Sequence, residues 1–462
     1  MSAAAWLERA ANLASALPRR RADDERMRWS RDRLAAWQRE RVAEIVRHAS
    51  ERSPFYRERL GGPVRGPVEL SALPILTKDQ LMDRFDEVVT DPRLRLEALL
   101  GHIEALRGDE LYLGEHRVMT SSGSSGRKAV YVYDRPAWRA IVMTANLRMS
   151  RMVGLKPGVP RPRIAVVAAP DGKHMTFRGG ASMDVGVFVS RRFSAASPVP
   201  ELVAALNDYA PDLMLGYPST LAILAEEQIA GRLRIRPKWV TTSSEVRTAS
   251  MAERIRAAFG VEPFDCLGLT EIGIAALDCT EHEGMHLFED LSIIEVVDEH
   301  GRAVPDGSPG AKILVTSLWN RVQPIIRFEV GDLMTVTSEP CACGRTFRRI
   351  VALDGRSDDV LELPGPSGLV SVHPIHLRGV LGRHAAVVAY QIVQREDDLE
   401  ALVVLAKDAA PEVVVELGCD LVAAVRAQGA EVPVVVRAVP AIVREPGVGK
   451  LKLVRARPRG CP

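Results

Sequence analysis

The sequence lacks an excess of charge of either sign. Its 462 residues include 61 lysines and arginines against 59 aspartates and glutamates, which gives a net charge of +2. A protein that binds nucleic acid or a membrane surface through its overall field normally carries a much larger excess. We therefore expect no nucleic-acid partner and no membrane partner, and a small molecule is the expected ligand.

Long hydrophobic runs are also missing. No apolar stretch approaches the roughly 20 residues needed to span a bilayer. The apolar N-terminal segment contains Glu8 and Arg9, which interrupt the core of a signal peptide and favour an amphipathic helix. The chain is therefore predicted to be cytoplasmic. Its six cysteines are then expected to be thiols or metal ligands, not disulfides.

Short apolar runs and helical stretches alternate through the middle of the chain. Residues 1–60 and about 78–106 show helical periodicity before this region begins. The alternation predicts βαβ units and a mainly parallel sheet. The predicted strands are 164–169, 212–217 and 238–243, and the predicted helices are 200–209 and 219–230.

The last third of the sequence changes character twice. Residues 290–337 alternate apolar and polar positions around Gly/Pro turns, which predicts an antiparallel or barrel-like β portion. The residues after 355–359 form another compact α/β pattern. We predict an α/β protein with a large N-terminal domain at 1–355, helical over about 1–110, and a small C-terminal α/β domain at 356–462.

The most informative segment is the Ser/Gly-rich stretch Thr120–Lys128. Hydroxyl and backbone N–H groups are the donors that phosphate oxygens need, and glycines let the backbone approach them. A mobile linker is the alternative, but a linker does not usually end in two cations and run into a strand. A Walker loop does not fit, because Gly123 and Gly126 are too close and Ala129 follows the lysine. The predicted phosphate-binding residues are Ser121, Ser122, Gly123, Ser124, Ser125, Gly126, Arg127 and Lys128.

This loop resembles the signature of adenylate-forming enzymes, the superfamily of acyl-CoA synthetases and adenylation domains. Other segments look like the phenylacetate-CoA ligase branch, and the resemblance covers nearly the whole chain. One motif alone is weak, whereas several in the family's order are specific. The matching segments are 53–60, 73–81, 216–227, 268–271 (Gly-Leu-Thr-Glu), 324–332 (PIIRFEVGD), 355–359 (GRSDD) and 449–452 (GKLK).

The resemblance implies a catalytic set of Lys450, Thr270 and Glu271. Glu271 is expected to ligate Mg²⁺, a cation that prefers oxygen ligands, and Thr270 to hydrogen-bond the α-phosphate. Lys450 is expected to bridge the substrate carboxylate and the α-phosphate as pyrophosphate leaves. Lys452 competes for this role, and Lys450 is preferred because it directly follows glycine. Asp358 is the expected hinge of a C-terminal domain that rotates between half-reactions.

The resemblance also assigns binding residues for the nucleotide and the acid. Asp332 and Arg356 are expected to bind the ribose. The further nucleotide contacts are Ser244, Glu245, Gly268 and Leu269, and the expected substrate contacts are Tyr217, Pro218 and Gly273.

Two departures from the family pattern concern the nucleotide site. Leu267 stands where the family usually has a tyrosine that stacks on adenine, and Arg127-Lys128 replaces the usual Lys-Pro. An apolar side chain can cover the ring face, but without the aromatic contribution.

Cysteine and histidine cluster in two nearby segments. Cys341 and Cys343 form a C-x-C pair, and Cys279 lies upstream with His282 and His286. Three thiolates and an imidazole suit tetrahedral Zn²⁺, although C-x-C is less specific than C-x₂-C. Zinc-bearing relatives of this branch favour His286 over His282. A closed Cys₃His site has no open position, so the predicted role is structural.

Together these features predict an AMP-forming ligase. It would convert a carboxylic acid, by resemblance an aryl or arylacetic acid, and ATP–Mg²⁺ into acyl-AMP and pyrophosphate, and then transfer the acyl group to CoA. The alternatives are a non-CoA acceptor, such as an amine, a carrier protein or a deazaflavin cofactor, and a degenerate nucleotide-binding homologue. The branch also suggests a possible homodimer.

Overall fold

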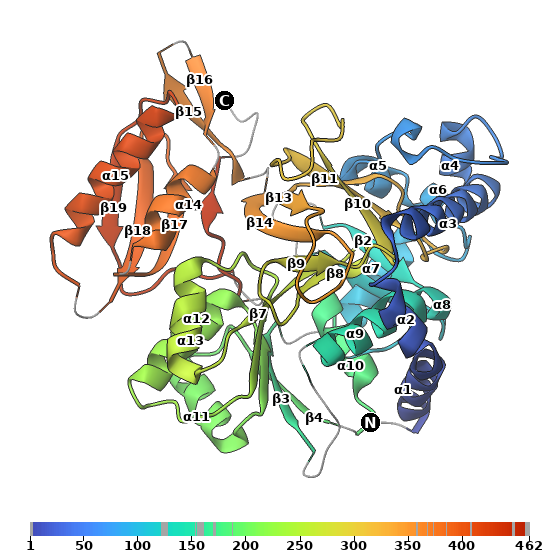
Figure 1. Cartoon of the computed structure of the whole chain (residues 1–462), viewed down its shortest axis with the longest axis horizontal. Helices are drawn as coiled ribbons and strands as arrows, with labels where there is room; N and C mark the ends of the chain where they lie inside the picture. Colours follow the sequence, from blue (N-terminus) through green and yellow to red (C-terminus); the bar gives the residue numbers. More distant parts are fainter. Residues whose placement is uncertain are drawn as a thin grey trace. The chain divides into compact units, whose positions relative to one another are not determined.

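The chain divides into two compact units in the computed structural model (Figure 1). The first unit comprises 1–162, 171–189 and 264–353, and the second comprises 163–170, 190–263 and 354–462. The described residues are 3–121, 128–152, 154, 161–169, 172–186, 188–356, 359–366, 368–372, 374–384, 386–406, 409–445 and 449–457.

The N-terminal third of the first unit is helical, as its periodicity predicts. Helix α3 (Arg31–Arg52) begins where the Ser30 hydroxyl accepts the N–H of Arg33, which satisfies one of the orphan donors of the first turn. Its buried residues, including Leu34 and Val42, lie at helical spacing. The other helices of this unit are α1 (Ala3–Ala16), η1 (Leu17–Arg19), α2 (Arg20–Arg26), α4 (Pro54–Arg59), η2 (Leu70–Ala72), α5 (Lys78–Asp83), α6 (Phe85–Val88), α7 (Leu96–Ala105), α8 (Arg135–Trp138), η3 (Arg139–Met143, a π-helix), α9 (Thr144–Met152) and α10 (Met175–Met183).

The strands of the first unit form a hairpin and two antiparallel arrays. The hairpin pairs β1 (Arg117–Thr120) with β2 (Val130–Tyr133), and both strands are fully buried. One array has the order β10-β11-β12 and the other the order β13-β14-β9-β8-β7. Their bounds are β7 (Phe264–Leu269), β8 (Gly273–Asp278), β9 (Met285–Leu287), β10 (Ser292–Val297), β11 (Lys312–Ser317), β12 (Phe328–Val330), β13 (Asp332–Thr337) and β14 (Arg349–Arg356).

The second unit contains the predicted βαβ arrangement. Strands β3 (Arg163–Ala168), β5 (Leu213–Gly216) and β6 (Trp239–Ser243) are parallel neighbours, and β4 (Val189–Ser194) follows in the order β6-β5-β3-β4. The helices that follow β4, β5 and β6 bury apolar faces against a core that includes Val167, Leu221 and Val240. These helices are α11 (Val199–Tyr209), α12 (Pro218–Ile229) and α13 (Ala249–Phe259).

The C-terminal part of the second unit has its own core. Strands β17 (Val387–Gln394) and β18 (Leu399–Leu405) are antiparallel, and β19 (Val434–Ala438) and β20 (Val454–Arg455) add parallel strands at either side. A separate hairpin joins β15 (Leu361–Gly365) and β16 (Gly368–Val372). Two helices, α14 (Pro374–Arg383) and α15 (Val413–Ala427), complete it.

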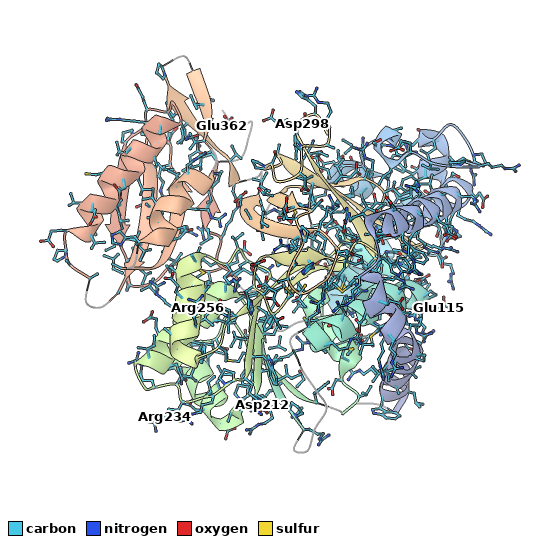
Figure 2. All side chains as sticks on the ribbon, viewed as in Figure 1. Glu115, Asp212, Arg234, Arg256, Asp298 and Glu362 are labelled. Atoms are coloured by element: carbon cyan, nitrogen blue, oxygen red, sulfur yellow. The ribbon has the colours of Figure 1, made fainter. Side chains whose placement is uncertain are left out.

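The predicted fold class is confirmed: the chain is α/β, with parallel strands where βαβ units are expected and an antiparallel array over 292–330. Charged side chains such as Glu115, Arg234 and Arg256 are exposed (Figure 2). Among the described residues, no helix has both the length and the apolar composition of a membrane-crossing segment.

Candidate active site and metal cluster

The predicted phosphate loop connects β1 to β2, and its two ends are fastened together. The N–H of Ser121 donates to the carbonyl of Ala129 at 3.0 Å, and the N–H of Ala129 donates to Ser121 Oγ at 3.1 Å. The N–H of Thr120 donates to the carbonyl of Lys173 at 3.1 Å. Lys128 is exposed beside these contacts. The predicted loop residues that lie outside the described part of the chain are Ser122, Gly123, Ser124, Ser125, Gly126 and Arg127.

The edge of β2 that does not face β1 is covered by side-chain amides. Gln323 accepts the N–H of Val132 at 2.8 Å and donates to the carbonyl of Val130 at 3.0 Å. Asn320 donates to the carbonyl of Val132 at 2.9 Å. Both amides are buried. They replace a neighbouring strand, because buried backbone groups need partners.

Strand β2 points two tyrosines at the predicted catalytic turn. The Tyr131 hydroxyl donates to Glu271 Oε1 at 2.7 Å, and the Tyr133 hydroxyl donates to the Thr270 carbonyl at 2.7 Å. Residues two apart share one face of a strand, so β2 holds both turn residues at once. Burial raises the pKa of Tyr133, and the nearby Glu271 charge raises it further. Tyr133 is therefore a hydroxyl donor and not a phenolate.

The turn that carries Thr270 and Glu271 joins β7 to β8. It closes where Leu269 pairs with Gly273, after a bulge at 267/268. Gly273 has φ +81°, and a Cβ there would lie 3.0 Å from Ile141 Cγ2. Both the conformation and the space thus favour glycine. Gly268 is exposed, whereas Leu267 is 9% exposed and packs in the core.

The Pro-x-x-Arg segment at 324–332 anchors the loop at 71–77. Arg327, 5% exposed, donates to the carbonyls of Ser71 and Leu73 at 2.8 and 2.6 Å and pairs with Glu295 at 3.1 Å. Burial raises the pKa of Glu295, and Arg327 opposes that shift. Asp332 is half-buried at the start of β13, five residues after Arg327. The motif arginine is therefore a structural residue, which leaves Asp332 as the candidate ligand-binding group.

In the second unit, a cluster forms beyond the carboxyl ends of β3, β5 and β6. This edge is where ligands bind in parallel α/β sheets. The hydroxyl of Tyr217, directly after β5, accepts the N–H of Ala169 at 3.0 Å. The ammonium of Lys450 lies 5.7 Å from the centroid of the Tyr217 ring, within the range of a cation–π contact. Pro218 is buried as the first residue of α12.

Glu245 and Arg444 extend this cluster. Glu245 Oε1 accepts the N–H of Leu451 at 2.7 Å, and its Oε2 accepts the N–H of Ser219 at 3.2 Å. Burial raises the pKa of Glu245, and the N–H donor of Leu451 opposes that shift. Burial lowers the pKa of Arg444, and Glu245 opposes that shift. Ser244, which precedes Glu245, has φ +69°, an uncommon conformation for a residue with a side chain.

The two lysines of the C-terminal motif have different neighbours. Lys452 Nζ lies 3.9 Å from Asp359 Oδ1, while Lys450 lies over Tyr217. Arg356 is half-buried at the end of β14. The predicted hinge residue Asp358 lies outside the described part of the chain.

The predicted residues thus fall into two groups. Thr270, Glu271 and Gly273 join the phosphate hairpin in the first unit, and Tyr217, Glu245 and Lys450 join in the second. Residue patterns did not identify Tyr131, Tyr133 or Arg444. The YVY strand contained the signal for the tyrosines, because alternation places both on one face. Nothing in the sequence marks Arg444.

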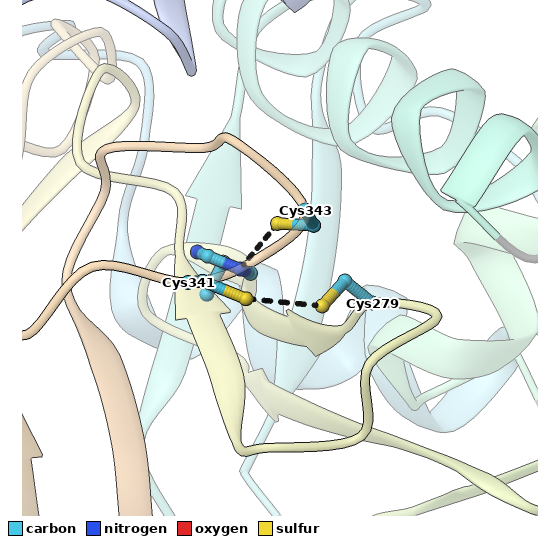
Figure 3. Close-up of side chains that lie close together, drawn as sticks. Cys279, Cys341 and Cys343 are labelled. Atoms are coloured by element: carbon cyan, nitrogen blue, oxygen red, sulfur yellow. Dashed lines mark hydrogen bonds between the residues drawn. The ribbon is translucent and has the colours of Figure 1, made fainter.

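The predicted metal ligands also come together. One ligand atom from each of Cys279, His286, Cys341 and Cys343 lies within 4.8 Å of all the others. The Cys279 and Cys341 sulfurs are 3.7 Å apart, and the Cys343 sulfur is 3.2 Å from His286 Nε2 (Figure 3). Zn–S bonds of about 2.3 Å in a tetrahedron place sulfurs about 3.8 Å apart. A disulfide would need about 2.05 Å, so the spacing suits a metal.

The surroundings of the cluster fix its histidine. His286 Nδ1 lies 3.0 Å from the carbonyl of Phe347, so Nδ1–H donates there and Nε2 faces the thiols. Burial lowers the pKa of His286 to about 4, which keeps the imidazole neutral. Burial raises the pKa of Cys279 to about 12; a bound cation would reverse that shift. His282 instead packs on Phe264, with ring centroids 4.7 Å apart, and is not in the cluster.

Known CoA ligases are similar to this chain in sequence. No protein-family model matches it. It is 28% identical over 382 residues to a phenylacetate-coenzyme A ligase of Thermus thermophilus, covering 79% of each chain. It is 27% identical over 374 residues to that of Escherichia coli, covering 75% of each. The chain is a homologue of the phenylacetate-CoA ligases.

Solved structures support the fold of this ligase homologue. A 2-hydroxyisobutyryl-CoA ligase in its postadenylation state superposes with a TM-score of 0.72 at 23% identity, covering 92% of this chain and 90% of that one. An anthranilate-CoA ligase bound to anthranoyl-AMP gives a TM-score of 0.54 at 18% identity, covering 72% of this chain and 64% of that one. At these identities, the likeness establishes the fold alone.

Proposed function

We propose that the chain is an AMP-forming acid–thiol ligase. It activates a carboxylic acid with ATP–Mg²⁺ and passes the acyl group to CoA. One observation carries the proposal: the strand that leaves the predicted phosphate loop holds Glu271, the predicted magnesium ligand, through the 2.7 Å hydrogen bond from Tyr131. A phosphate site and a cation ligand fixed to one hairpin are what ATP–Mg²⁺ binding needs.

The first half-reaction forms one bond and breaks one. A carboxylate oxygen of the acid attacks the α-phosphorus, the α–β anhydride bond breaks, and pyrophosphate leaves with the bonding electrons. Glu271 would hold Mg²⁺, which would supply positive charge to offset that of the departing pyrophosphate. Thr270 positions the α-phosphate, and Lys450 lowers the energy of the charge that builds between acid and phosphate. Asp332 and Arg356 orient the ribose, and Gly268, Leu269 and Ser244 line the nucleotide.

The second half-reaction transfers the acyl group. The CoA sulfur attacks the acyl carbonyl, the C–O bond to AMP breaks, and the thiol proton goes to solvent. The resemblance names Tyr217, Pro218 and Gly273 as the proposed acid-binding residues. The homologues act on phenylacetate and benzoate by name, which supports an aryl or arylacetic acid. We propose that 356–462 moves as a domain between the half-reactions, with Asp358 as its hinge.

We also propose a structural zinc ion bound by Cys279, His286, Cys341 and Cys343. A zinc ion would cross-link the four residues, and protein ligands would fill all four of its expected positions. The ligands connect β8, β9 and the turn before β14, so the ion would tie three segments together. Purified protein should contain about one zinc per chain, and plasma emission spectroscopy measures it.

An acid panel tests the proposed function. Pyrophosphate release is measured with each acid plus ATP–Mg²⁺, with and without CoA, and products are identified by mass spectrometry. Acid-dependent release with consumption of CoA supports the ligase. Release without CoA consumption favours another acceptor, such as an amine or a carrier protein. Absence of both turnover and ATP binding across the panel would reject the enzyme and favour a degenerate nucleotide-binding homologue.

Two further expectations belong to this proposal. The chain is expected to act in the cytoplasm, where ATP and CoA are available, and to form a homodimer. Light scattering on the purified protein measures the mass, and a mass of one chain would reject the dimer.

A further inference from the structure

Two charged side chains hold the backbone on either side of Lys450, one on each side. Arg444 Nη1 donates to the carbonyl of Gly449 at 2.8 Å, and Glu245 Oε1 accepts the N–H of Leu451 at 2.7 Å. Both side chains also reach the start of α12. Arg444 Nη1 donates to Ser219 Oγ and Thr220 Oγ1 at 3.0 Å each, and Glu245 Oε2 accepts the Ser219 N–H at 3.2 Å.

The backbone around Lys450 adds to this restraint. The carbonyl of Lys450 accepts the N–H of Glu445 at 2.8 Å, and the N–H of Gly449 donates to the carbonyl of Glu445 at 2.9 Å. Gly449 has φ +71°, and a Cβ there would lie 2.6 Å from the carbonyl carbon of Ala195. Only glycine fits this approach. The residue before Lys450 therefore sits directly on the turn that follows β4.

We propose that Arg444 and Glu245 form a latch that positions Lys450, so that they control adenylation without touching the reacting atoms. The inference rests on the proposed function, because that function gives Lys450 its role in the first half-reaction. A lysine side chain has four rotatable bonds, and its ammonium reaches one point reliably only when its backbone is fixed. Misplacing a charged group by about 1 Å can cost about 10²-fold in rate.

The contacts of the latch are polar and few. Arg444 and Glu245 join residues 449 and 451 to α12 through hydrogen bonds, and water can satisfy the same groups when they separate. A fastening of this type can open and reform, whereas a packed apolar contact would not separate readily. We therefore expect the latch to matter in the half-reaction that needs Lys450, and to be dispensable in the one that does not.

Measuring the half-reactions separately tests the latch. Acid-dependent pyrophosphate release is followed with the best acid of the panel, and thioester formation is followed from the matching synthetic acyl-AMP plus CoA. Arg444→Ala should lower the first rate by about 30-fold and change the second less than about twofold. Arg232→Ala is the matched control, because Arg232 pairs with Glu227 on the exposed face of α12. Equal losses in both half-reactions would mean that Arg444 only stabilises the fold, and would overturn the proposal.

A double-mutant cycle shows whether Arg444 acts through Lys450. In a Lys450→Ala background, Arg444→Ala should cause no further loss of pyrophosphate release, because the group that it positions is gone. A full, additive loss would overturn the proposal. Arg444→Lys should recover part of the activity, since an ammonium keeps the charge and three N–H donors but sits on a shorter side chain than the guanidinium.

Hydrogen–deuterium exchange tests the latch without any turnover. Glu245→Gln keeps the size of the side chain but leaves one acceptor oxygen in place of two. The Leu451 amide should then exchange about tenfold faster than in the wild-type protein, with Arg232→Ala again unchanged. Unchanged exchange in Glu245→Gln would contradict the latch. Wild-type protein with a protected Leu451 amide but no acid-dependent turnover would instead contradict the proposed function and leave the latch standing.

Discussion

The two segments that carry the predicted catalytic residues are held in different ways. The Thr270–Glu271 turn joins two antiparallel strands and takes hydrogen bonds from tyrosines of a third, buried strand. The segment with Lys450 is fixed by two charged side chains, and one of them lies about 200 residues earlier in the chain. The first is part of a packed core, whereas the second is held mainly by part-buried polar contacts.

The difference suggests that the first segment binds ATP throughout the reaction, whereas the second changes position between the half-reactions. Groups that hold ATP through the whole cycle benefit from rigid support, because preorganised donors need no rearrangement at the moment of reaction. A group that is needed in one half-reaction benefits from support that can be released. Glu271 and Lys450 should therefore respond differently to the loss of their neighbours.

Removing Lys450 should give the largest effect. Lys450→Ala is expected to lower acid-dependent pyrophosphate release by about 10²- to 10³-fold, the typical cost of losing one group that offsets transition-state charge. Thioester formation from synthetic acyl-AMP should stay within about threefold. Lys452→Ala is the matched control. If Lys452→Ala lowers pyrophosphate release more than Lys450→Ala does, Lys452 is the catalytic lysine.

Glu271→Gln should have the next largest effect. It should lower the rate of pyrophosphate release by about 10²-fold, because a neutral amide is a poor magnesium ligand. The loss should appear in the first half-reaction and be partly recovered at high Mg²⁺, as a magnesium titration of pyrophosphate release would show. If the variant keeps both the rate and the magnesium dependence of the wild type, Glu271 is not the ligand.

Loss of the metal cluster should affect the rates of the two half-reactions equally. Cys341→Ser is expected to lower zinc content and to cost about 3 kcal/mol of stability, measured by metal analysis and thermal unfolding. Any loss of rate should be equal in the two half-reactions. Cys419→Ser is the control, because Cys419 is exposed and lies outside the cluster. Zinc content unchanged in Cys341→Ser would contradict the assignment.

Tyr131→Phe should have the smallest effect. A hydrogen bond to a charged group contributes about 1.5–3 kcal/mol, and from the low end of that range we expect about a tenfold loss of rate and a higher magnesium concentration for half-maximal rate. Tyr56→Phe is the matched control, since Tyr56 is buried and donates to the carbonyl of Pro324 at 2.8 Å. The same magnesium shift in both variants would indicate a general loss of stability.

Much of the fold follows from residue periodicity. The predicted strands at 164–169, 212–217 and 238–243 correspond to β3, β5 and β6, and the predicted helices to α11 and α12, with ends displaced by a few residues. Local pattern decides these elements, because each buries one face against a neighbour close in sequence. The predicted boundary at 356 stays a prediction, since the compact units combine distant segments.

The site was less accessible to sequence reasoning than the fold. Motif order named Glu271 and Lys450, but not the residues that hold them. Tyr131 read as a strand residue, and Arg444 as one arginine among many, because their partners lie 140 and 225 residues away. Such contacts depend on how distant segments pack, which a single sequence does not encode locally. The cysteine cluster was predictable because its donor chemistry is rare.

The amides of Asn320 and Gln323 have a consequence for how the phosphate loop can vary. They specify the position of β2 from outside the hairpin, so the strand does not depend on the residues at 122–127 for its register. The loop can then accept foreign sequences while its anchor points persist. Exchanging 122–128 between distant relatives becomes a practical route to varying the contacts with the phosphates, and endings such as Arg127-Lys128 can arise by drift without dissolving the hairpin.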